Sequence, residues 1–231
     1  MKKIIEYIMR HKYRLAIFAL LSAASVVCVI LFRFRVAYSD TYRYSFLIWN
    51  LFLAWIPFMI AYFTYGLTLV RKALLVIIPV SAFLWLIFFP NAPYILTDFQ
   101  HLGQDNGAAP LWYDVIMLIW FAWTGLLLGV ISLYLMHQIV KREFGRVPGW
   151  LFVFGVAALS SIGIYIGRFI RWNSWDILRN PFGIASNLID QAVDPSLRSI
   201  GFISLYAVFF MFIYITLYAF GHLLQEGSGR S

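Results

Sequence analysis

The sequence predicts an all-α, polytopic integral membrane protein built as a bundle of six transmembrane helices. Hydrophobic residues make up 62% of its 231 residues and charged residues 12%, about half the charged share of ordinary soluble domains. A membrane-spanning helix needs about 20 consecutive, mostly apolar residues. Six stretches meet that requirement: residues 15–32, 45–70, 73–89, 112–135, 150–170 and 199–224.

The first three spans are marked by their flanks and their prolines. Basic residues precede the first span, which is typical of a cytoplasmic flank. The second span contains Pro57, which is expected to kink it because proline lacks a backbone donor and clashes with the preceding turn. The third contains Pro79 and is expected to end at Pro90.

The last three spans have recognisable sequence features. Trp112 opens the fourth span as an aromatic anchor at headgroup depth. Gly163 and Gly167 give the fifth span a G-x-x-x-G spacing, which permits the close approach of a neighbouring helix. The Asp-Pro pair at 194–195 suits the first turn of the sixth span.

The surplus of basic residues points to membrane orientation and not to nucleic acid. The formal net charge is +8, but the Lys and Arg residues are spread over short connections between apolar stretches. More of them fall on the side of the N-terminus, and this bias predicts that both termini face the cytoplasm. We therefore expect a multi-pass protein of the plasma membrane with no nucleic-acid partner. The single cysteine, Cys28, excludes an intrachain disulfide.

Residues 1–226 are expected to form one transmembrane domain, because no internal repeat divides them. Residues 227–231 read Gly-Ser-Gly-Arg-Ser, a composition typical of a flexible linker. The two longest connections, residues 90–111 and 171–198, both fall on the outer side of the predicted topology. Long connections are frequently functional, and we expect short interfacial helices in both.

The first polar segment follows the third span, where a short helix is predicted from residue 91 to about 102. Four polar residues follow one another at separations of three, four and three residues: Asn91, Tyr94, Asp98 and His101. This spacing places them on one helical face. A carboxylate and an imidazole one turn apart suit a catalytic base with its orienting partner, or two ligands of a divalent metal ion. An ordinary Asp98–His101 hydrogen bond on an interfacial helix explains the pair equally well.

The second polar segment lies at the start of the fourth span, where Asp114 follows Trp112 and Tyr113. The helix dipole favours a carboxylate in the first turn, so Asp114 has a structural explanation. It is also a candidate acid–base residue, provided that the fold brings it near the other polar groups.

The third and densest polar segment leaves the fifth span and holds Arg168, Arg171, Asn173 and Asp176. Charges so close to hydrocarbon are costly and usually face protein or water. Paired guanidinium groups suit phosphate or carboxylate because each donates bidentate hydrogen bonds. The alternative interpretation is that both arginines snorkel to the headgroups and form salt bridges with nearby aspartates.

Because the three segments share one side of the predicted topology, we expect them to form a single outward-facing site. The candidate catalytic residues are Asp98, His101, Asp114 and Asp176. The candidate substrate-binding residues are Asn91, Tyr94, Arg168, Arg171 and Asn173. A divalent metal ion is the candidate cofactor, with Asp98 and His101 as its ligands.

Three stretches of the chain carry a resemblance to a known family. They are Phe-Pro-Asn-Ala-Pro-Tyr-Ile-Leu-Thr-Asp at 89–98 with His-Leu at 101–102, Trp-Tyr-Asp at 112–114 with Trp-Thr-Gly at 123–125, and Gly-Arg-Phe-Ile-Arg-Trp-Asn-Ser-Trp-Asp at 167–176. On these stretches the chain resembles the uncharacterised bacterial integral membrane proteins of domain-of-unknown-function family 1361. The resemblance implies a polytopic membrane protein and brings no activity with it.

The residues leave three functions open. The first is a metal-assisted enzyme, or a binding protein, that acts on an anionic, lipid-linked or phosphate-containing substrate at the outer leaflet. The second is a transporter or channel for a small solute or ion, with the Asp, His and Arg side chains as a gate or proton relay. The third is a non-catalytic assembly module in which these side chains form structural salt bridges. The lipid bilayer is the partner in all three, and the oligomeric state stays open.

Overall fold

The computed structural model describes residues 2–70, 77–103, 108–172, 179, 182–183, 186 and 196–228. The regular elements in these ranges are all helices, and no strand occurs in them. Six helical segments of this part of the chain are long and apolar enough to cross a membrane. The predicted all-α fold with six spanning helices is therefore confirmed, and the protein is a multi-pass membrane protein.

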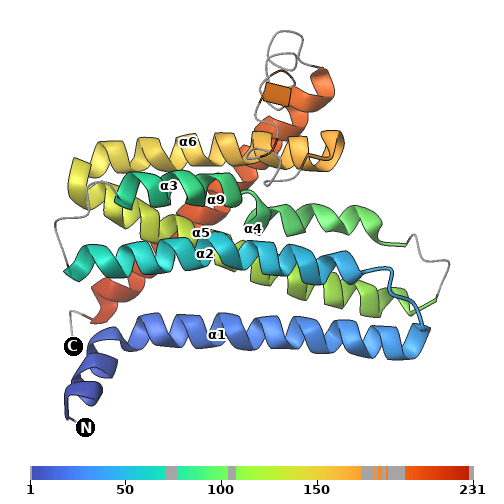
Figure 1. Ribbon diagram of the computed structural model, residues 1–231, viewed down its shortest axis with the longest axis horizontal. Helices are drawn as coiled ribbons and strands as arrows, with labels where there is room; N and C mark the ends of the chain where they lie inside the picture. Colours follow the sequence, from blue (N-terminus) through green and yellow to red (C-terminus); the bar gives the residue numbers. More distant parts are fainter. Residues whose placement is uncertain are drawn as a thin grey trace.

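The long helices run back and forth through the bundle, and α1 begins at the same end where α9 finishes (Figure 1). In chain order the elements are α1 (Lys2–Ser39), α2 (Ser45–Val70), α3 (Ile77–Phe88), α4 (Asn91–Tyr94), the 3₁₀ helix η1 (Ile95–His101), α5 (Leu111–Phe144), α6 (Arg146–Tyr165), the π-helical turn η2 (Ile166–Ile170) and α9 (Leu197–Ser228).

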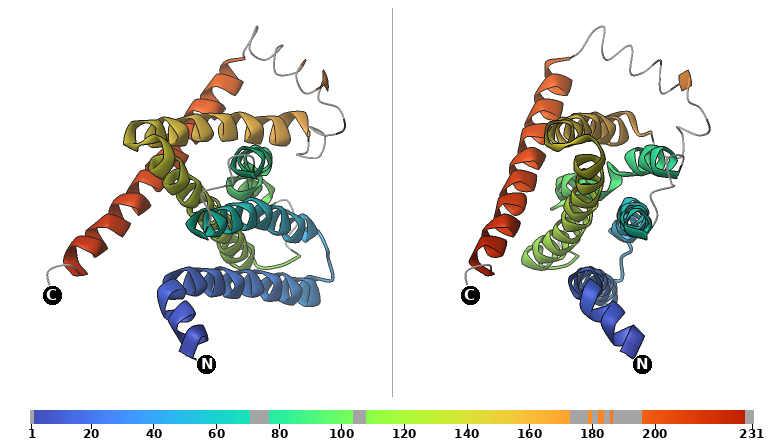
Figure 2. Two further views of the ribbon diagram at one scale, coloured as in Figure 1. Left: turned by 60° about the vertical axis from the view of Figure 1, so that its left-hand side comes forward. Right: turned by 90° about the vertical axis from the view of Figure 1, so that its left-hand side faces the viewer.

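Helix α5 is the centre of the bundle. It contacts α1, α2, α4, η1 and α6, and it is the most deeply buried of the six spans. Helix α6 packs in turn against α9, which crosses the bundle obliquely on the side away from α1 (Figure 2). One apolar cluster lies mainly between α1, α2 and α5, and a second lies mainly between α3, α5, α6 and α9.

The third span is a broken helix. The apolar segment Ile78–His101 is interrupted at Phe89 and Pro90, between the end of α3 and the start of α4. The sequence predicted a span of 73–89 followed by a separate short helix in the outer connection. In the structure that short helix is the second half of the same span, because α4 and η1 pack against α2 and α5.

Glycines on neighbouring helices make room for this break. A Cβ on Gly125 of α5 would lie 2.6 Å from Cδ1 of Ile95 and 2.8 Å from the carbonyl oxygen of Ala92. A Cβ on Gly163 of α6 would lie 2.9 Å from Cγ of Pro90. Small residues allow such close approach within membranes, where helices associate largely through packing.

Polar side chains bind two backbone carbonyls beside the break. In hydrocarbon an unpaired carbonyl is costly because no water can reach it. The Asn91 amide donates to the Phe88 carbonyl at 2.9 Å. The Tyr206 hydroxyl of α9 donates to the Pro93 carbonyl at 2.5 Å. Both contacts add side-chain hydrogen bonds to the backbone at the break.

Two arginines of α1, Arg14 and Arg35, lie near opposite ends of its membrane-spanning part. Arg14 and Arg35 are separated by about 31 Å of helix, at about 1.5 Å per residue. This length matches the hydrocarbon thickness of a bilayer, about 30 Å. Arg35 pairs with Asp114 at the start of α5, so the two helices reach the same membrane boundary.

Candidate functional site

Arg168 lies at the end of the fifth span, where the helix changes its geometry. Helix α6 continues into η2, the short π-helical turn that contains Arg168. Such turns are rare and frequently occur at functional positions. The turn ends at Arg171, whose φ of 66° and ψ of 32° are left-handed. Because a π turn holds more residues than an α turn, it alters which side chain faces the third span.

The Arg168 guanidinium is bound by four residues of the third span. It forms an ion pair with Asp98, and its Nε donates to the Thr97 hydroxyl at 2.8 Å. Its Nη1 lies 3.3 Å from Nε2 of His101. Its central carbon lies 4.3 Å from the centroid of the Tyr94 ring, within cation–π range. The four residues thus present one face to Arg168, as helical spacing predicts.

Asp98 brings a third helix into this network. One of its carboxylate oxygens accepts from Arg168, and the other accepts a hydrogen bond of 2.9 Å from the Asn50 amide of α2. The Asp98 side chain is 1% exposed and that of Arg168 is 7% exposed. Charges buried to this degree persist when they have an opposite partner and further hydrogen bonds. Asn50 supplies the further bond to Asp98, and Thr97 supplies it to Arg168.

His101 is the more accessible member of the network. It is half-buried, whereas Asp98 is buried. Its ring packs against Phe46, with the two centroids 4.9 Å apart. Arginine can only donate hydrogen bonds. The contact with Arg168 therefore uses Nε2 of His101 as an acceptor.

Asp114 belongs to a second, separate ion pair. Arg35 of α1 donates from Nε to Oδ1 of Asp114 at 2.7 Å and from Nη2 to Oδ2 at 3.3 Å. The Nη1 of Arg35 donates to the Thr41 hydroxyl at 2.8 Å. Both charged side chains are almost completely buried. This pair fastens the end of α1 to the start of α5.

Tyr44 connects the two ion pairs. The guanidinium carbon of Arg35 lies 4.5 Å from the centroid of the Tyr44 ring, and the Tyr44 hydroxyl donates to the His101 carbonyl at 3.2 Å. Burial, together with the nearby Asp114 carboxylate, raises the pKa of the Tyr44 phenol. The phenol therefore stays a neutral donor at physiological pH. We call the connected residues the polar network: Arg35, Tyr44, Asn50, Thr97, Asp98, His101, Asp114 and Arg168.

A family model described as "Protein of unknown function (DUF1361)" matches residues 49–216, which is most of the chain. The chain belongs to the DUF1361 family. The resemblance noted in the sequence is thus confirmed. No match was found among curated proteins or among solved structures.

The structure of this DUF1361 protein brings part of the predicted site together: Tyr94, Asp98, His101 and Arg168 meet around one ion pair. Of the other predicted residues, Asn91 and Asp114 make separate contacts. Asn91 supports the helix break, Asp114 pairs with Arg35, and Arg171 is exposed. Asn173 and Asp176 lie outside the described residues.

Four members of the polar network were absent from the predicted site: Arg35, Tyr44, Asn50 and Thr97. On the sequence alone, Arg35 counts only as one of the basic residues that bear on membrane orientation. A signal was available for Asn50, because an amide inside an apolar span needs a polar partner. Thr97 lies three residues after Tyr94, so helical spacing would have included it on the same face. Nothing in the sequence links Arg35 to Asp114.

The donor set of the polar network does not fit a divalent metal ion. The described part of the chain holds no group of three His, Cys, Asp or Glu residues that could share one. Asp98 and His101, the two predicted ligands, face a guanidinium instead. Both Asp98 oxygens are engaged by Arg168 and Asn50, and a fixed cation repels a second cation at close range.

Proposed function

We propose that this DUF1361 membrane protein binds an anionic group at the end of the polar network where Arg168 meets His101. The phosphate of a lipid or of a lipid-linked molecule has the chemistry that an arginine fork recognises. In this proposal the protein is a membrane-embedded binding protein whose buried ion pairs hold the binding groups in position.

The observation that carries the proposal is a remaining donor on Arg168. A guanidinium has five N–H groups, and contacts with described residues account for four of them. The fifth is on Nη1, beside the half-buried His101. Asp98, Thr97 and Tyr94 fix the plane of the guanidinium, so a phosphate would meet a preorganised donor and lose little affinity to side-chain ordering.

Further arginines add positive charge around Arg168. Arg171 is exposed at the end of η2. Arg198, at the start of α9, is also exposed, and its guanidinium carbon lies 4.7 Å from the ring of Phe169. Because Asp98 neutralises Arg168, these two arginines add net positive charge to this part of the described chain. A positive field attracts anionic groups to this end of the bundle.

We propose the outer face of the plasma membrane as the location of this site, with both chain termini in the cytoplasm. The bias of Lys and Arg toward the connections on the side of the termini supports this orientation. An anionic headgroup in the outer leaflet would then meet Arg168 at the boundary of the hydrocarbon.

Binding fits the geometry better than catalysis does. A general acid or base has to reach the proton that it transfers, at about 3 Å or through one water. Asp98 and Asp114 are buried and each is paired with an arginine, so neither carboxylate is presented to a substrate. Only His101 among the predicted acid–base residues of the described chain is partly accessible.

A structural role for the polar network is the second candidate function. The two ion pairs join α1 to α5, and α2 to the third and fifth spans. Both are buried, as expected of contacts that staple helix ends. In this case the protein would be an assembly module without a ligand at Arg168.

A transporter remains the third candidate, and the broken third span is the observation in its favour. Carriers often place their sites at broken helices near the middle of the membrane. Here the break is packed against Gly125 and Gly163, and its carbonyls are bound by Asn91 and Tyr206. This packing gives the break a structural explanation of its own.

Calorimetry on the purified protein in an uncharged detergent tests the proposal. The probes are inorganic phosphate and dihexanoyl phosphatidate, titrated into the wild type and into Arg168→Lys. A hydrogen bond to a charged group contributes about 1.5–3 kcal/mol, so this change should weaken binding by roughly 10-fold or more. The matched control is Arg33→Ala. Arg33 is exposed on α1, near the end of that helix where Arg35 joins the polar network.

Two outcomes would contradict the proposal. In the first, neither probe binds the wild type, while Arg168→Lys lowers the thermal stability; this result favours the structural role. In the second, Arg33→Ala weakens binding as much as Arg168→Lys does. This result would mean that the probes respond to the overall positive charge of the surface and not to Arg168 itself.

A further inference from the structure

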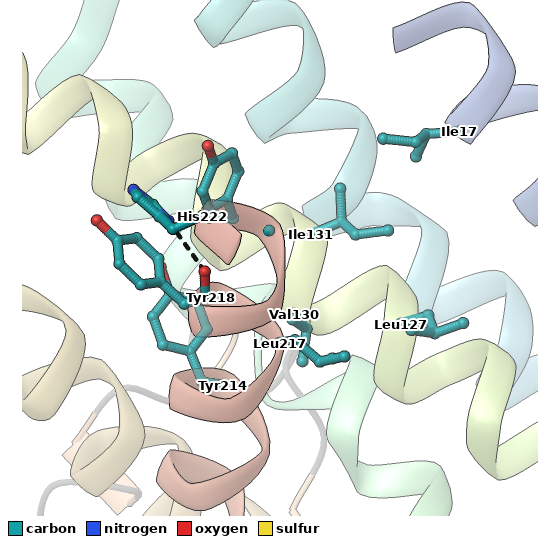
Figure 3. A pocket seen from close by; sticks show the side chains of 10 residues that line it. Ile17, Leu127, Val130, Ile131, Tyr214, Leu217, Tyr218 and His222 are labelled. Atoms are coloured by element: carbon teal, nitrogen blue, oxygen red, sulfur yellow. Dashed lines mark hydrogen bonds between the residues drawn. The ribbon is translucent and has the colours of Figure 1, made fainter. Parts of the chain in front are cut away.

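A cavity of about 270 Å³ lies between α1, α5 and α9 (Figure 3). Its lining residues belong to the first half of α1 and the second half of α9, at the end of the bundle where α1 begins and α9 finishes (Figure 1). The cavity walls are mostly apolar, with Leu127, Val130 and Ile131 on α5, Leu217 on α9 and Ile17 on α1. It is far from the polar network, because α5 begins at the polar network and the cavity lines its second half.

The half-buried cation Arg14 lies near the α1 wall of the cavity. Arg14 lies one helical turn before Ile17, on the same face of α1. Its guanidinium carbon lies 4.6 Å from the centroid of the Tyr62 ring, and its Nη2 donates to the Tyr62 carbonyl at 3.1 Å. The Nε of Arg14 is buried and has no hydrogen-bond partner among the described residues. A guanidinium has five N–H groups, so Arg14 has further donors that an anionic group bound beside it can use.

The α5 and α9 walls carry polar groups at the same level. Tyr134, Tyr218 and His222 line the cavity, and Lys141 donates to the Tyr218 hydroxyl at 3.4 Å. The His222 ring stacks on that of Tyr218, with the centroids 4.3 Å apart. Figure 3 shows Tyr218 and His222 grouped on α9, with Leu217 nearby on the same helix. The cavity is therefore apolar toward the membrane centre and cationic and phenolic toward the boundary.

We propose that this cavity holds one acyl chain of a phospholipid with an anionic headgroup, drawn from the leaflet on the side of the chain termini. The chain packs against Ile17, Ile131 and Leu217, and the phosphate accepts hydrogen bonds from Arg14 and Lys141. Arginine and lysine at the boundary of the hydrocarbon attract anionic lipid headgroups.

Mass spectrometry of the intact protein released from detergent micelles tests the inference. The protein is purified with equal amounts of phosphatidylglycerol and phosphatidylcholine, and the retained lipids are counted. We expect phosphatidylglycerol to be retained at least fivefold more than phosphatidylcholine. Leu217→Trp, which fills the cavity, and Lys141→Gln should each lower that retention by fivefold or more.

Two control variants separate this site from the rest of the molecule. Leu205→Trp adds the same bulk to the exposed surface of α9, since Leu205 is 74% exposed, and it should leave lipid retention unchanged. The losses in Leu217→Trp and Lys141→Gln should be as large in an Arg168→Lys background as in the wild-type background, so failure here and failure of the proposed function are distinguishable. Equal retention of the two lipids, or equal losses in Leu217→Trp and Leu205→Trp, would overturn the inference. Thermal unfolding of each variant confirms that the compared proteins are folded.

Discussion

Arg35 and Asp114 illustrate how the protein keeps charge at the edge of the hydrocarbon. Each ion alone would pay a desolvation penalty of several kcal/mol in such a place. Together they form a two-point contact through Nε and Nη2 of the arginine, and Thr41 binds the remaining Nη1. The pair is stable because few of its polar groups are left unpaired.

This arrangement predicts that replacing one partner of the ion pair lowers the free energy of unfolding more than expected from half the loss in the double variant. Arg35→Met and Asp114→Leu should each destabilise the protein by about 3–5 kcal/mol, because each leaves an uncompensated buried charge. The double variant should lose clearly less than the sum of the two. Thermal unfolding in detergent measures all three. Additive losses would show that Arg35 and Asp114 do not act on each other.

The raised pKa of Tyr44 predicts that the stability of the protein depends on pH in the alkaline range. Its raised pKa means that the folded state keeps the phenol proton at a pH where the unfolded chain has lost it. The stability from Tyr44 is therefore complete below the ordinary value of about 10 and is lost as pH rises through the higher folded value. Tyr44→Phe should be about 1 kcal/mol less stable than the wild type at pH 7–9.

Unfolding curves collected from pH 7 to 11 test this sign. The difference between the wild type and Tyr44→Phe should narrow above pH 10, because only the wild type then loses a contribution. A difference that widens in that range would mean that the ionised phenolate stabilises the fold.

At the scale of the helix, the break in the third span depends on glycine. Gly125→Ala should destabilise the protein by about 1–3 kcal/mol, since the new methyl group would overlap Ile95 and the Ala92 carbonyl. The matched control is Gly155→Ala on α6, where no atom lies within 4 Å of the added Cβ. Equal melting temperatures for Gly125→Ala and the wild type would show that the break is not held by this contact.

The same element shows what the sequence could and could not predict. The lengths of the apolar stretches were sufficient to predict six spans, and the spacing of Tyr94, Asp98 and His101 was sufficient to predict their common face. The sequence did not reveal that the span resumes after Pro90, because a proline at that place usually ends a helix. The glycine and tyrosine contacts that sustain the break come from α5, α6 and α9, far along the chain.

The sequence pattern also could not predict which arginine pairs with which aspartate. Asp114 could have joined Arg168, Arg171 or Arg35 as far as sequence spacing is concerned. Its choice of Arg35 follows from the packing of α1 on α5, which brings two helix ends to the same boundary. The single predicted pocket is therefore two ion pairs connected through Tyr44.

For the whole molecule, the proposed topology predicts that the two ends of the bundle lie on opposite sides of the membrane. Tyr42→Cys, in the exposed connection after α1, should react with a membrane-impermeant maleimide on intact cells. Phe144→Cys, at the exposed end of α5, should react only after permeabilisation. Cys28 is buried and should stay unlabelled. The reverse labelling pattern would place the termini outside and move Arg168 to the cytoplasmic face.

An experimental structure with saturating dihexanoyl phosphatidate tests the central claim, that Arg168 presents a fixed donor to an anionic group. The account predicts a phosphate oxygen about 3 Å from Nη1 of Arg168, with the Asp98–Arg168 pair and its Asn50 contact still in place. A phosphate bound only at other positions, or an Arg168 that leaves Asp98 to reach its ligand, would contradict it.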